Sequence, residues 1–308
     1  MRRYYFTGPC FLIIFFLFFS FVSCSATKNI VKKITPAKDN LKKRVMVLPI
    51  INQAGAGSIT ASQITEIFVE FLKKSPHLLL YESPKGLSWP PTNKLNQFGV
   101  VFADDDLVKK AEDLGINAII TGILNPIEKT NKKTGIWPFR KSHTVYEVCV
   151  VINVMDISSK TLLLSKLESE EALADEEKIT TYEEEVLTDK KEISDQMLRK
   201  SLTPILGHLA SSVASKLLKA PWNGKILATR NTSVDINAGK DVGLKPGQRF
   251  DVFGLGESIA AKNGRILFLL GKKMGEIRVT SVGEKNSLAV PEAKEPLLPG
   301  QVIRFIGD

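Results

Sequence analysis

The order of apolar runs and amphipathic segments after residue 44 limits the fold of this 308-residue chain more than any other feature. Residues 45–51 (VMVLPII) form a continuous apolar run, which is typical of a strand covered on both faces. Thr60 and Gln63 then have the spacing of a capping box, in which each side chain satisfies a backbone donor of the other residue. The apolar positions that follow lie on one helical face: Ile64, Ile67, Phe68, Phe71 and Leu72.

The same alternation continues to the middle of the chain. Residues 77–82 (HLLLYE) and 117–124 (NAIITGIL) are predicted strands, and a helix is predicted between Asp104–Asp106 and Gly115. A hairpin over 145–156 and 161–169 follows. The last segment is a long amphipathic helix from Leu198 to Leu217, which Pro204 either kinks or divides. Residues 44–220 are therefore predicted to form an α/β (α+β), three-layer-like domain with a mixed sheet.

Residues 221–308 predict a second domain of different class. The boundary is marked by Pro221-Trp222-Asn223-Gly224, after which six or seven short strands alternate with turns. Residues 237–253 (NAGKDVGLKPGQRFDVF) carry three glycines and a Pro-Gly turn just before a strand. This pattern is typical of a small all-β, barrel-like domain.

The N-terminal 43 residues predict export. Arg2 and Arg3 precede an apolar run at 11–22, and small residues flank Cys24, which is the order found in a signal peptide over residues 1–23. Residues 24–43 are polar and basic, as expected of a tether.

Residues 21–24 (FVSC) resemble the lipobox of bacterial lipoproteins, except that Phe21 stands where leucine is usual. The resemblance implies cleavage before Cys24 and lipidation of Cys24, and Ser25 then favours the outer membrane, with the protein on the periplasmic side. Two alternatives stay open: an uncleaved N-terminal anchor in the inner membrane, and ordinary secretion.

The phrases KKRVMVLPI, DLGINAIITGIL and VVINVMDISSKTLL resemble a periplasmic domain found in three families. These are the curli-secretion lipoproteins, the N-terminal part of the Tol-system β-propeller protein and the middle domain of flagellar assembly protein T. The phrase at 237–253, with GEIRVTSV at 275–282, resembles the C-terminal domain of flagellar assembly protein T. The resemblance implies a scaffold or assembly factor for a flagellar or secretion machine.

The alternative function is a ring-forming subunit of a curli-type secretion channel. The curli-type relative inserts two amphipathic hairpins into the membrane. The corresponding stretches here, 125–144 and the acidic segment from Glu168, lack the sustained apolar alternation of a spanning strand. We therefore expect no such hairpins.

Charge is divided unevenly along the chain, whose net charge is +9. Residues 168–195 hold twelve acidic residues and three lysines, a net charge of −9. Residues 24–167 and 196–308, which lie outside both this segment and the predicted signal peptide, together carry a net charge of +16. The chain has no nucleic-acid-binding motif and is predicted to be exported, so we expect envelope proteins as partners, membrane contact through the lipid anchor, and no nucleic acid. A homo-oligomer is left open.

An aromatic tip is the candidate contact site. Ile136, Trp137 and Phe139 are framed by Lys132, Lys133, Arg140 and Lys141. Aromatic residues among basic ones suit a membrane interface or a partner pocket. The alternative is a loop whose Trp137 folds back onto the domain.

No residue pattern points to catalysis. The Gly-Lys pairs at 239–240 and 271–272 lack the spacing of a P-loop, and the three histidines lack metal-ligand spacing. Cys149 lies in a predicted buried strand, where cysteine behaves as a small apolar residue. We expect a non-enzymatic protein without a cofactor or metal ion.

Overall fold

The computed structural model describes residues 41–54, 59–83, 105–136, 141–173, 193–254, 256–260, 266–292 and 296–307. Residues 40–308 belong to one compact unit. In chain order, its first part contains β1 (Lys43–Val47), β2 (Ile51–Asn52), α2 (Ala61–Lys73), β3 (Leu78–Tyr81), α3 (Asp105–Asp113), β4 (Ala118–Leu124), β5 (Glu128–Thr134), β6 (Lys141–Asp156), β7 (Thr161–Leu173) and α4 (Asp195–Lys219).

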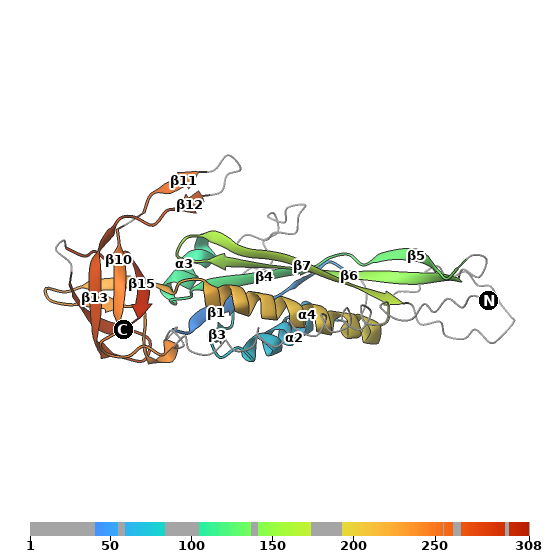
Figure 1. Ribbon diagram of the computed structural model, residues 1–308, viewed down its shortest axis with the longest axis horizontal. Helices are drawn as coiled ribbons and strands as arrows, with labels where there is room; N and C mark the ends of the chain where they lie inside the picture. Colours follow the sequence, from blue (N-terminus) through green and yellow to red (C-terminus); the bar gives the residue numbers. More distant parts are fainter. Residues whose placement is uncertain are drawn as a thin grey trace, which may run out of the picture. The chain divides into compact units, whose positions relative to one another are not determined.

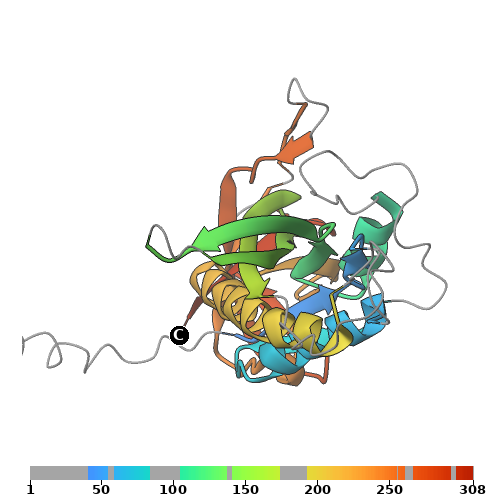
Figure 2. The ribbon, with the colours of Figure 1, turned by 90° about the vertical axis from the view of Figure 1, so that its right-hand side faces the viewer.

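The seven strands form one mixed sheet in the order β3-β1-β4-β6-β5, with β2 paired to β4 and β7 paired to β6. Strands β3, β1 and β4 run parallel, and β6 runs antiparallel to β4. Helices α2 and α4 cover one face, where their apolar side chains share a core with the sheet (Figures 1 and 2). Helix α3 packs on the opposite face. The predicted α/β fold with a mixed sheet is confirmed.

A local sequence signal accounts for the start of helix α2. Helix α2 has the predicted capping box: Gln63 N donates to Thr60 Oγ1 at 3.3 Å, and Thr60 N donates to Gln63 Oε1 at 3.0 Å. Helix α4 runs unbroken for 25 residues with Pro204 inside it. Among the helices of the described ranges, none is both long and apolar enough to cross a bilayer.

The second part is a closed barrel of six strands in the order β10-β13-β14-β9-β8-β15, as the barrel-like prediction required. A separate hairpin, β11–β12, stands between β10 and β13 in the chain. Trp222 and Phe305 both pack edge-on against Phe250 inside the barrel, at ring distances of 5.7 and 5.4 Å. The elements are β8 (Asn223–Thr229), β9 (Val234–Ile236), the 3-10 helix η1 (Lys240–Val242), β10 (Arg249–Phe253), β11 (Ser258–Ala260), β12 (Ile266–Phe268), β13 (Lys273–Val282), β14 (Ser287–Pro291) and β15 (Val302–Gly307).

One turn is used twice in the barrel, a repeat that the sequence analysis overlooked. The segments LKPGQ (244–248) and LLPGQ (297–301) lead into β10 and β15, which pair with each other. In each, the glutamine side chain accepts a 3.0 Å hydrogen bond from the backbone N–H three residues earlier. The glycines, Gly247 and Gly300, have φ of 92° and 87°, a left-handed conformation that favours glycine.

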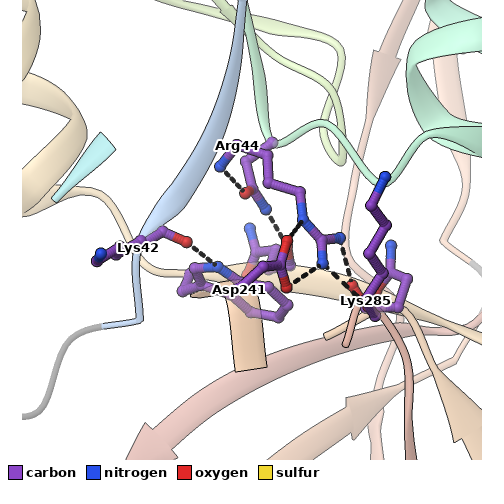
Figure 3. Close-up of polar contacts among 8 residues, drawn as sticks. Lys42, Arg44, Asp241 and Lys285 are labelled. Carbon is purple, nitrogen blue, oxygen red and sulfur yellow. Dashed lines mark hydrogen bonds and ion pairs between the residues drawn. The ribbon is translucent and has the colours of Figure 1, made fainter. Parts of the chain in front are cut away.

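A buried ion pair joins the barrel to the sheet (Figure 3). Arg44 of β1 is 2% exposed and donates two hydrogen bonds to Asp241 of η1, at 2.7 and 2.8 Å. It also donates to the carbonyl oxygens of Asn237 and Lys285, at 2.8 and 2.9 Å. Gly115 packs against the guanidinium so closely that a Cβ there would lie 2.6 Å from an Arg44 nitrogen.

Residues at the start of β1 strengthen the same junction. Leu41 is buried in the barrel core, and the Trp222 indole N–H donates to the Lys42 carbonyl at 3.0 Å. The Lys43 ammonium donates to the carbonyl oxygens of Ala220 and Pro221, both at 2.7 Å. The last three residues of the expected tether therefore belong to the folded body.

We predict that Asp241→Asn lowers the free energy of unfolding by about 3 kcal/mol, because the Arg44 charge stays buried without its counter-charge. Urea unfolding measures the effect. Arg230→Gln is the control, since Arg230 pairs with Asp235 at 3.1 Å while its side chain is 66% exposed. That change should cost less than about 1 kcal/mol. Equal losses in the two variants would contradict a structural role for the buried pair.

A second prediction concerns pH. Burial lowers the pKa of Lys43 from 10.5 to about 8, although Asp156 opposes the shift. Between these two pH values the unfolded chain holds a proton that the folded chain has released, so the folded state gains stability as pH rises. Relative to Lys43→Met, the wild type should gain about 2 kcal/mol between pH 7 and 9.5, measured by urea unfolding. A constant difference across this range would show that Lys43 does not titrate there.

Candidate interaction site

A three-stranded ribbon, defined as β5, the first half of β6 and the second half of β7, carries the predicted contact site. Strand β5 pairs along one side of β6 and β7 along the other. Figure 1 shows β5 and β6 running on past the end of α4. Within the described residues, β5 and β7 each pair only with β6, so the ribbon has two free edges.

Strand β5 was not predicted. The segment 125–144 lacks apolar alternation, and every residue of β5 is polar and exposed. Backbone pairing with β6 forms this strand, whereas the sequence analysis looked for a buried apolar face. For the same reason β6 begins at Lys141 instead of the predicted 145, and β7 extends to Leu173 instead of 169.

The two edges carry opposite charge. Strand β5 holds three lysines (Lys129, Lys132 and Lys133). The end of β7 holds three glutamates (Glu168, Glu170 and Glu171). Lys132 and Glu171 meet across the ribbon in an ion pair whose side chains are 48% and 53% exposed. Glu168 is paired with Lys166 at 2.7 Å. Exposed pairs of this kind contribute at most about 1 kcal/mol each, so a charged partner can exchange with them at little cost.

The tip begins at the end of β5. Gly135 has a φ of 104°, which turns the chain, and the next residue, Ile136, is 85% exposed. Of the predicted site residues, Trp137 and Phe139 lie outside the described residues, and so does Cys24. Whether Trp137 folds back onto the domain therefore stays untested. The described part of the tip presents one apolar side chain to solvent.

Cys149 lies on β6, where the ribbon leaves the body of the sheet. Its neighbours Val148 and Val150 are fully buried toward the helices, but Cys149 points to the other face and is only partly buried. The strand is buried, as predicted, but Cys149 itself is only partly covered, because only alternate residues of this strand face α2 and α4. Burial raises the pKa of the thiol, while a 3.6 Å hydrogen bond from the Asn125 amide opposes the shift. The described residues hold no group of three or more His, Cys, Asp or Glu side chains able to bind a metal ion.

We predict slow alkylation of Cys149. A chain that begins at residue 25 has Cys149 as its sole cysteine. Because the raised pKa leaves less thiolate, its reaction with iodoacetamide at pH 8 should be slower in the folded protein than in urea. Mass spectrometry of the modified peptide measures both rates. Equal rates in the two states would contradict the raised pKa.

Comparison with known proteins gives similarity of structure only. No family model matches the chain, and no curated protein does so. A solved PelC dodecamer from Paraburkholderia phytofirmans shares 14% identity at a TM-score of 0.32, over 59% of this chain and 91% of that one. Lipoprotein GNA1162 from Neisseria meningitidis shares 14% identity at a TM-score of 0.26, over 58% of this chain and 99% of the other. TolB from Acinetobacter baumannii shares 12% identity at a TM-score of 0.30, over 84% and 62%. Similarities this distant assign no function.

Proposed function

We propose that this protein is a non-enzymatic outer-membrane lipoprotein that acts in the periplasm as a scaffold or assembly factor for an envelope machine of flagellar or secretion type. Lipid chains on Cys24 hold it at the membrane, and the following residues link the lipid to the folded body. The observation that carries the proposal is the ribbon, whose two oppositely charged edges pair with no further strand among the described residues, together with its exposed tip.

The ribbon suits contact with another protein. A free strand edge offers backbone donors and acceptors to a further chain. Separated positive and negative edges then select the orientation of that chain, because opposite charges attract and like charges repel. Exposed Ile136 adds an apolar contact beside the basic edge.

The composition of β5 favours an assembly factor over a channel subunit. A strand that faces lipid carries apolar side chains at alternate positions. In β5 both faces are polar: Glu128, Thr130 and Lys132 alternate with residues that are equally hydrophilic. A partner with polar groups and charges therefore fits this strand better than a lipid chain does.

Site-specific cross-linking in intact envelopes tests the proposal. A photoreactive amino acid at position 136 should give discrete adducts with other envelope proteins. The matched control is position 240, an exposed lysine of the barrel turn η1, which should give none of these adducts. Cys24→Ala in the position-136 chain should weaken the adducts, because the protein leaves the membrane surface.

Two outcomes would contradict this assignment. Identical adducts from positions 136 and 240 would show that the ribbon has no special role. A ladder of self-adducts with fixed stoichiometry would support the ring-forming alternative instead. Replacing Ile136 by the photoreactive residue should change the free energy of unfolding by less than about 0.5 kcal/mol, because the Ile136 side chain is 85% exposed, so the adducts report contacts of the folded protein.

A further inference from the structure

A groove of about 550 Å³ lies at the carboxyl ends of the parallel strands β1 and β3, beside helix α2. Ligands of open α/β sheets commonly bind at the carboxyl ends of strands. One wall is a stripe of α2, and the other is the end of β3 with the two residues after it. The groove and the ribbon belong to opposite edges of the sheet, because β3 is the first strand in the sheet order and β5 is the last.

The groove combines an apolar floor with an acidic rim. Val69 of α2 and Leu80 of β3 are half-buried and pack against the main core. Around them stand three exposed carboxylates, those of Glu66, Glu70 and Glu82. The single lysine of the lining, Lys73, is paired with Glu70 at 2.6 Å. The groove therefore keeps an excess of negative charge.

Strand β3 also offers a free edge. Within the described residues it pairs only with β1, in a register that runs from Lys43 opposite Leu78 to Met46 opposite Tyr81. Backbone groups of a strand point alternately to its two sides, so about half of those in β3 face away from β1. A further strand added along this side would lie next to the groove.

From these three features we propose that the groove binds an extended peptide segment of a partner protein, in which lysine or arginine residues stand two positions before and after an apolar residue, so that all three side chains lie on one face of the added strand. The segment pairs with the free edge of β3, as in other cases of strand addition. Its apolar side chain occupies the floor at Val69 and Leu80, and its basic side chains meet Glu66 and Glu82. The charge of the rim disfavours an anionic lipid headgroup or an acidic peptide at the same place.

This site goes beyond the proposed scaffold function and does not depend on it. The ribbon would bind through edges of both signs, whereas the groove selects a basic strand. A purified-component experiment can therefore succeed or fail without any membrane, lipid anchor or envelope partner.

The test uses the full-length protein in detergent and two fluorescent seven-residue peptides. One has a central valine with lysine two positions before and after it and threonine at the other positions, and the other has glutamate in place of both lysines. Fluorescence anisotropy should show binding of the lysine peptide only, weakening as salt is added. Glu66→Lys should raise the Kd about tenfold, because an attraction becomes a repulsion. The matched control is Glu257→Lys, at an exposed position before β11 that belongs neither to the groove nor to the ribbon, and it should leave the Kd unchanged.

Hydrogen exchange separates strand addition from simple charge attraction. Binding of the lysine peptide should slow exchange of amides in β3 and leave those of β7 unchanged. The proposal is overturned if the lysine peptide fails to bind at millimolar concentration, or if Glu66→Lys changes the Kd by less than about twofold. Binding without protection of β3 would remove the strand pairing. If the unlabelled protein self-associates and this association displaces the lysine peptide, the groove binds a second copy of the chain, and the proposal is equally overturned.

Discussion

The pairing of Arg44 with Asp241 is the interaction on which the arrangement of this protein depends. Removing a guanidinium from water is costly, and the structure offsets that cost with one carboxylate and two carbonyl oxygens, all within 2.9 Å. Because Arg44 belongs to β1 and its partners belong to the barrel, the first strand of the sheet is held by the second part of the chain. Gly115 completes the site, since a larger residue would collide with the guanidinium.

This junction makes the sheet and the barrel one body, in agreement with the single compact unit formed by residues 40–308. The hydrogen bonds of Lys43 and Trp222 cross the same boundary. Two surfaces of different chemistry are then carried by one frame. At one end of the sheet, the ribbon has one positively charged and one negatively charged edge. At the other end, the groove beside β3 has an acidic rim over apolar side chains.

Sequence patterns located part of the candidate site and missed the rest for a common reason. The composition of the segment predicted a contact tip that includes Ile136. The structure places this side chain in solvent, and the contact itself stays a prediction. Strand β5 was not expected, because a strand exposed on both faces has no apolar periodicity to reveal it. The groove was also missed, since Glu66 and Glu82 read as ordinary solvated residues until α2 and β3 are placed side by side.

The sequence by itself determined much of the local structure: the order of the helices and of the strands with an apolar face, the capping box of Thr60 and Gln63, and the existence of a small β part after residue 221. These features depend on contacts between residues that are close in the chain, and the spacing of apolar and polar residues indicates such contacts. Only the tertiary structure decided the partner of Arg44, which lies 197 residues away, and the closure of the barrel. It also decided which strands of the described part of the chain lie at the edges of the sheet. Such features arise from pairing between distant segments, and no local pattern encodes which segment will meet which.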